Sequence, residues 1–170
     1  MLSKLFKDIA EEEGAKLEIT DEILDFGDGS RCPHLVYKIR LIYKEKHINF
    51  INKTGTQFYG LVSCDFPEKL KNLEFEITTR SHFTSLFVKN KERIKITTQS
   101  AKINSFLKQS SAFRELVQIS NNTAFEPWIL AKNIEEKYNI TTKYSLQFSD
   151  WTQSIRPIIK FQKEFIDYFN

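Results

Sequence analysis

The segment LVYKIRLIYKEK, residues 35–46, alternates apolar and basic side chains with a period of two. Tyr37 and Ile39 have one parity, whereas Lys38 and Arg40 have the other. Successive side chains of a β-strand point to opposite faces, so the pattern predicts a strand with one apolar and one basic face. Such a strand belongs in a sheet that packs on a core through one side only.

Other short segments have the same period, or are similarly rich in β-branched and aromatic residues. They predict further strands within residues 16–26, 47–52, 56–66, 73–79, 84–90, 93–99, 125–132 and 137–148. The spaces between the early strands are too short for the crossover helices that parallel strands need. The sheet is therefore expected to be antiparallel.

Helical spacing of apolar residues occurs near both ends of the chain and after Ser100. The first helix is expected to end near Gly14, and the segment after Ser100 is expected to form either one helix or a pair of helices divided at Ser110 and Ser111. Pro157 fits the first turn of the last helix, where its missing N–H costs nothing. The apolar stripe of this long C-terminal helix contains Ile155, Ile158, Ile159, Phe165, Ile166 and Phe169.

The order of strands first and helices later predicts an α+β fold, with an antiparallel sheet packed against helices. A chain of 170 residues suits one domain, residues 1–170, and is long enough to bury a core without disulfides. The 15 phenylalanines predict that this core is rich in aromatic rings.

The net charge of +3, from 25 basic and 22 acidic residues, does not by itself indicate a nucleic-acid partner. Basic residues are nevertheless segregated along one predicted strand and along a later segment. One set of equal parity contains Lys38, Arg40, Lys44 and Lys46, and the other contains Lys89, Lys91, Arg93 and Lys95. If both segments are strands of one sheet and adjoin, the sets form a basic face for an anionic partner. Otherwise each set is a solvated face balanced by nearby acids.

Two further segments have an interpretation as a site and an interpretation as ordinary structure. Arg80 and His82, among the hydroxyls of residues 78–85, suit a phosphate or carboxylate, but threonines are also common in edge strands. Phe125 and Trp128 would line a groove if they were exposed. We expect them in the core, because the whole chain is rich in phenylalanine.

The segment DFGDGSRCPH, residues 25–34, contains fragments of several motifs but completes none. A protein kinase needs a glycine-rich loop and a lysine strand before its DFG triplet, and only 24 residues precede this one. No helix follows the glycines, as a dinucleotide-binding loop requires, so no cofactor is expected. Cys32 and His34 are the candidates for a metal site, but their spacing supplies no ligand set, and no metal is expected.

The N-terminal sequence has no apolar core of a signal peptide, and no run of about 18 apolar residues occurs. We therefore expect a cytoplasmic protein without a membrane span, whose two cysteines are free thiols. The sequence favours a small soluble binding or interaction domain without evident catalytic activity, whose partner is an unknown protein or an anionic ligand. The alternatives are a binder of nucleic acid or a phosphate-bearing ligand through a basic sheet face, and a small enzyme that uses a Cys/His site.

Overall fold

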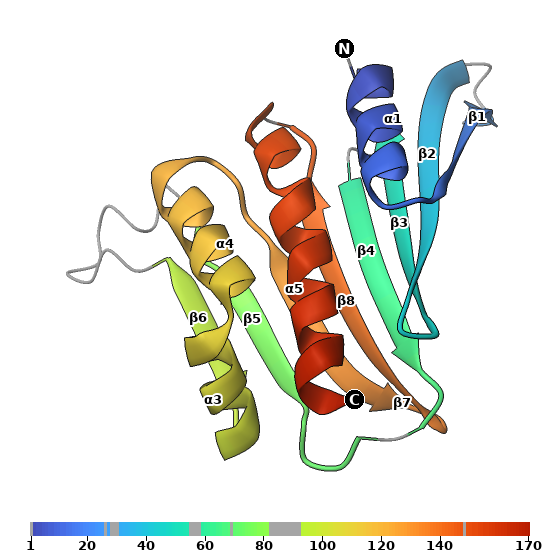
Figure 1. Ribbon diagram of the computed structural model, residues 1–170. Coiled ribbons are helices and arrows are strands. Elements are labelled where there is room, and N and C mark those ends of the chain that lie inside the picture. Colours follow the sequence, from blue (N-terminus) through green and yellow to red (C-terminus); the bar gives the residue numbers. More distant parts are fainter. Residues whose placement is uncertain are drawn as a thin grey trace.

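A computed structural model describes residues 2–25, 27, 31–54, 59–68, 70–81, 93–147 and 149–170. Its strands form one eight-stranded sheet in the order β1-β2-β3-β4-β8-β7-β5-β6, and every neighbouring pair is antiparallel (Figure 1). The strands are β1 Lys16–Asp25, β2 Arg31–Tyr43, β3 Lys46–Thr54, β4 Tyr59–Phe66, β5 Phe75–Thr79, β6 Ile94–Thr98, β7 Trp128–Ile134 and β8 Lys137–Ser145. The antiparallel sheet that the sequence predicts is confirmed.

The described helices lie together on one face of this sheet (Figure 1). Helix α1 lies near β1 and β2, α5 runs along the middle of the sheet, and α3 and α4 lie in front of β5 and β6. Their bounds are α1 Leu2–Glu12, α3 Ala101–Gln109, α4 Ser111–Asn122 and α5 Ile155–Phe169, and a 3-10 helix, Ser149–Gln153, precedes α5. The fold is α+β, as expected. None of the described helices is long and apolar enough to cross a membrane.

In chain order, the strands at the two ends of the sheet precede the two strands in its middle. Strands β1 to β4 form consecutive hairpins, and β5 pairs with β6 at the far end. Strands β7 and β8 follow α4 and lie between β4 and β5. The sheet is therefore continuous only when the C-terminal part of the chain is in place.

The core between sheet and helices is built from aromatic rings, as the composition predicts. Phe165 of α5 lies at its centre, with its ring centroid 5.4 Å from Phe106, 5.7 Å from Phe66 and 5.9 Å from Tyr138. The apolar stripe of α5 faces this core, and Phe169 at its end is partly buried. Rings of this size bury enough apolar area to fix the helix on the sheet.

Two local features of the helices also agree with the sequence. Ser110 separates α3 from α4, and its hydroxyl accepts a hydrogen bond of 2.9 Å from the backbone N–H of Phe113. This is the N-cap geometry that serine favours. Pro157 lies in the first turn of α5, where its missing N–H leaves no helical bond unmade.

Gly60 of β4 shows how tightly the core side of the sheet is packed. A Cβ atom at this position would lie 2.1 Å from the ring of Tyr144 and 2.4 Å from the side-chain oxygen of Asn52. The Tyr144 hydroxyl donates a hydrogen bond of 2.9 Å to that oxygen. Glycine therefore leaves room for a buried tyrosine–asparagine pair that spans three neighbouring strands.

Candidate functional site

The face of the sheet opposite the helices is covered by no helix of the described chain, and we call it the open face (Figure 1). Strand alternation and the pairing register assign side chains to it, because the core residues of β2 to β5, β7 and β8 have the opposite parity and directly paired residues share a face. Its basic residues on β1 to β3 are Lys16, Lys38, Arg40 and Lys53, and those on β6 to β8 are Lys95, Lys132, Lys137 and Lys143. Its acidic residues on the strands are Glu18, Glu22, Asp65 and Glu76, so positive charge exceeds negative charge.

A depression of about 530 Å³ lies on the open face over β1 to β4. Lys16, Lys38 and Arg40 line it together with the acidic Glu18, and the polar side chains Asn49 and Ser63 complete it. Cross-strand pairing explains this gathering, since Lys16 lies opposite Arg40, and Arg40 opposite Asn49. Two of the predicted basic residues, Lys38 and Arg40, thus share a concave surface with a third basic residue, Lys16.

Arg40 is held in this depression by a hydrogen bond of 3.2 Å from its Nε to the Asn49 side-chain oxygen. Its side chain is exposed, whereas Lys38 is half-buried. Within the described residues, neither Lys16 nor Lys38 forms an ion pair. A positioned guanidinium beside unpaired ammonium groups is suited to a phosphate or carboxylate oxygen.

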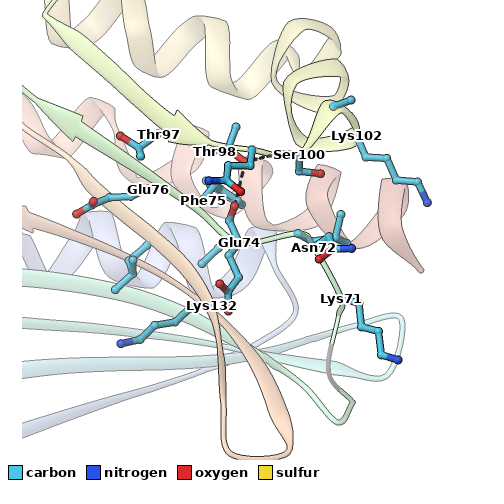
Figure 2. A pocket seen from close by; sticks show the side chains of 15 residues that line it. Lys71, Asn72, Glu74, Phe75, Glu76, Thr97, Thr98, Ser100, Lys102 and Lys132 are labelled. Atoms are coloured by element: carbon cyan, nitrogen blue, oxygen red, sulfur yellow. Dashed lines mark hydrogen bonds between the residues drawn. The ribbon is translucent and has the colours of Figure 1, made fainter.

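A larger depression of about 860 Å³ lies at the end of β5, β6 and β7, next to the start of α3 (Figure 2). Lys71, Lys102 and Lys132 line it, but their side chains diverge, and the carboxyl groups of Glu74 and Glu76 lie among them. Glu74 accepts hydrogen bonds from the backbone and side-chain nitrogens of Asn133 and so serves the local fold. These mixed charges do not converge on one ligand group.

Trp128, at the start of β7, is 39% exposed on the open face, while Phe125 is buried. The expectation that both lie in the core is therefore correct for Phe125 and wrong for Trp128. Ile129 and Ala131 take the core side of β7, which turns Trp128 to the opposite side. The Trp128 Nε1–H donates a hydrogen bond of 2.8 Å to Glu76, and the Lys143 ammonium lies 5.5 Å from its ring centroid.

The prediction that Arg93 faces solvent as part of a basic set is wrong. Its side chain is 2% exposed, and it donates hydrogen bonds to the carbonyl oxygens of Arg80, Ser120 and Thr123. It also forms an ion pair of 2.9 Å with Glu126. The guanidinium satisfies carbonyl groups at the C-terminal end of α4, so Arg93 has a structural role.

The described members of the two basic sets also do not adjoin. Strand β2 is second in the sheet, whereas β6 is the last strand at the other edge. Lys44 leaves the first set because it lies in the turn after β2 with φ of 46° and forms an ion pair of 2.7 Å with Asp167 of α5. Arg80 is exposed after β5, and His82, Lys89 and Lys91 lie outside the described residues.

Cys32 and His34 lie two residues apart on the same side of β2, and His34 is 2% exposed. Neither lines one of the two depressions described above. Among the described residues, no three His, Cys, Asp or Glu side chains are grouped closely enough to hold a metal ion. Burial raises the pKa of the other thiol, Cys64, to about 12, so it is not a thiolate at neutral pH.

Lys16, Trp128 and Lys143 are among the open-face residues that the sequence did not indicate. The signal for Lys143 was present, because it alternates with Ile140, Thr142 and Tyr144 in β8, whose parity is buried. The signal for Lys16 was its alternation with Leu17. Comparison of this chain with protein-family models, with curated proteins and with solved structures finds no match.

Proposed function

We propose that this protein is a binding domain that holds an anionic partner, a nucleic acid or another phosphate-bearing ligand, on the open face of its sheet. The observation that carries the proposal is the convergence of Lys16, Lys38 and Arg40 in one depression with Asn49 and Ser63. Ammonium and guanidinium groups bind phosphate through charge-assisted hydrogen bonds, and neutral polar groups add directional contacts.

The rest of the open face supports an extended partner more than a single small ion. The depression includes residues of four strands, and further lysines lie on β7 and β8 outside it. Glu18 opposes an anion at this site, but it is outnumbered there by three cations. A polyanion that crosses several strands gains from all of these lysines.

The experiment is a charge reversal on the open face with a matched control on the helix layer. Lys38→Glu with Arg40→Glu changes the net charge by the same amount as Lys4→Glu with Lys7→Glu on the exposed side of α1. Each protein is applied to heparin and eluted with salt, and its fold is checked by a thermal melt. We expect the open-face variant to elute at clearly lower salt than the wild type and the α1 variant.

The salt dependence of binding distinguishes a specific phosphate site from non-specific electrostatic binding. Each phosphate contact contributes close to one unit to the slope of log K against log salt concentration, so the open-face double variant should lower this slope by about two. Equal losses in both double variants would mean that only net charge matters. A wild type without salt-sensitive retention would contradict the proposal.

A further inference from the structure

Resting on the proposed function, we infer that the partner is single-stranded nucleic acid that crosses the strands of the open face and stacks one base on Trp128. Heparin and duplex DNA provide negative charge for the basic residues but no accessible base faces for the ring. A single strand also has unpaired base faces, which are the surfaces that an exposed aromatic ring on a sheet binds.

Trp128 is positioned for stacking rather than loosely exposed. Its 39% exposure leaves part of the ring accessible, and its Nε1–H is fixed by the 2.8 Å hydrogen bond to Glu76 of the neighbouring strand β5. This bond also occupies one carboxylate oxygen of Glu76, which is the acidic residue that contacts the ring. A ring held in one orientation loses little freedom when a base stacks on it.

Lys143 lies beside this ring, directly opposite Trp128 in the pairing of β7 with β8. Its ammonium is 5.5 Å from the ring centroid in the free protein. A base that stacks on the indole displaces this exposed ammonium, which then lies next to the phosphate of the same nucleotide. Trp128 and Lys143 thus supply the two contacts that sequence-independent binding of a nucleotide needs.

The register of the sheet connects this pair to the depression. Going across the strands from Lys38, the directly paired residues are Ile51, Leu61 and Lys143, and Trp128 follows on β7. Four strand spacings of about 4.8 Å separate β2 from β7, or roughly 19 Å. Ile51 and Leu61 are half-buried apolar side chains between two basic ends. This is the order of contacts that suits bases in the middle and phosphates near the lysines.

The test measures binding of a fluorescein-labelled oligothymidine of 20 nucleotides, the corresponding duplex and heparin to wild type, Trp128→Leu and Trp128→Phe. Loss of one stacked base weakens binding by roughly 5- to 150-fold. We expect that loss for Trp128→Leu with the oligothymidine and near-wild-type binding for Trp128→Phe. Elution from heparin should be unchanged in both, since heparin has no bases, and circular dichroism confirms the fold of each variant.

Intrinsic fluorescence gives a second readout, because stacking quenches indole emission. The chain has two tryptophans, and Trp151 is buried on the other side of the sheet. Oligothymidine should quench the wild type and leave the Trp128→Leu variant unquenched. This readout depends on contact with the ring and not on the stability of the variant.

The outcomes separate the inference from the proposed function. The inference is overturned if Trp128→Leu binds oligothymidine as tightly as the wild type does, or if the wild type binds duplex and single strand with equal affinity. In either case, retention on heparin would still support the proposed function. Binding to polyglutamate without binding to oligothymidine assigns the face to an acidic protein and also overturns it. If neither heparin nor oligothymidine binds the wild type, the proposed function fails as well.

Discussion

The ring of Phe165 contacts aromatic residues from both layers of the molecule, including Phe66 and Tyr138 of the sheet and Phe106 of α3. Phe165→Ala should lower the free energy of unfolding by about 3–5 kcal/mol, because it removes a large ring from a core that cannot collapse around the space. Urea denaturation followed by circular dichroism measures this. Tyr168→Ala, on the exposed side of α5, is the control and should cost about 1 kcal/mol or less. Equal losses would place the centre of the core elsewhere.

Glu164 of α5 accepts hydrogen bonds from the hydroxyls of Ser110 and Ser111 and from the backbone N–H of Ala112, at the start of α4. Burial raises the pKa of Glu164, but these hydrogen bonds outweigh it, and the pKa lies below its ordinary value. A lowered pKa means that the ionised carboxylate stabilises the folded state. The contribution is complete above the ordinary glutamate pKa and is lost as the pH falls through the lowered value.

Glu164→Gln should therefore reduce stability near pH 7 by about 1–2 kcal/mol, since a neutral amide is a weaker acceptor for three donors. The difference from wild type should shrink as the pH falls through the lowered pKa of Glu164, because the wild-type carboxyl then becomes protonated. Urea denaturation at pH 7 and at a series of acidic pH values measures it. Glu115→Gln, on the exposed side of α4, is the matched control. A difference that does not change with pH would contradict the assignment to the carboxylate.

Among the elements, the edge strand β6 and helix α4 are joined at one point by Arg93. Its guanidinium binds carbonyl oxygens of Ser120 and Thr123 at the end of α4 and the carboxylate of Glu126 beyond it. Glu126 is partly exposed, but removing the buried Arg93 leaves the carbonyl oxygens without their donor, at a cost of roughly 1–3 kcal/mol. Arg93→Ala should lower stability by this amount in urea denaturation. Lys95→Ala, two positions along and exposed, should change it by less than about 0.5 kcal/mol.

Most elements of the fold could be predicted because each leaves a local pattern. The alternation in β2 and the stripe in α5 are visible in a few residues of sequence, and Ser110 marks the junction of α3 and α4. Arg93 shows the limit of this reasoning. Its parity matches Lys95, but its surroundings are set by the end of α4, about 30 residues away along the chain. The parity of a residue predicts the side of the strand on which its side chain lies. Whether that side chain is buried depends on which other segments pack against that side.

At the scale of the whole molecule, the strand order could not be predicted from these patterns. Hairpins between consecutive strands follow from short connections, but the insertion of β8 and β7 between β4 and β5 depends on pairings between distant segments. This order separates Lys38 and Arg40 from Lys95. It instead places Lys143 and Trp128 in the same row of cross-strand pairs as Lys38 on the open face. Individual residues of the candidate site are therefore indicated by the sequence. Which of them lie close together follows only from the strand order of the sheet.

The same order predicts how the molecule unfolds. Trp151 packs near α1, with its ring 6.1 Å from Phe6, whereas Trp128 lies on β7 in the other half of the sheet. Because β8 pairs with both β4 and β7, loss of either half exposes an unpaired strand edge on the other. Trp128→Phe and Trp151→Phe each leave one fluorescent reporter, and we expect the emission of each variant to change at the same urea concentration as its own circular dichroism. Comparing two probes within one variant removes the effect of the substitution itself on stability. A Trp151 transition that precedes the loss of secondary structure would instead mean that the half near α1 unfolds as a separate unit.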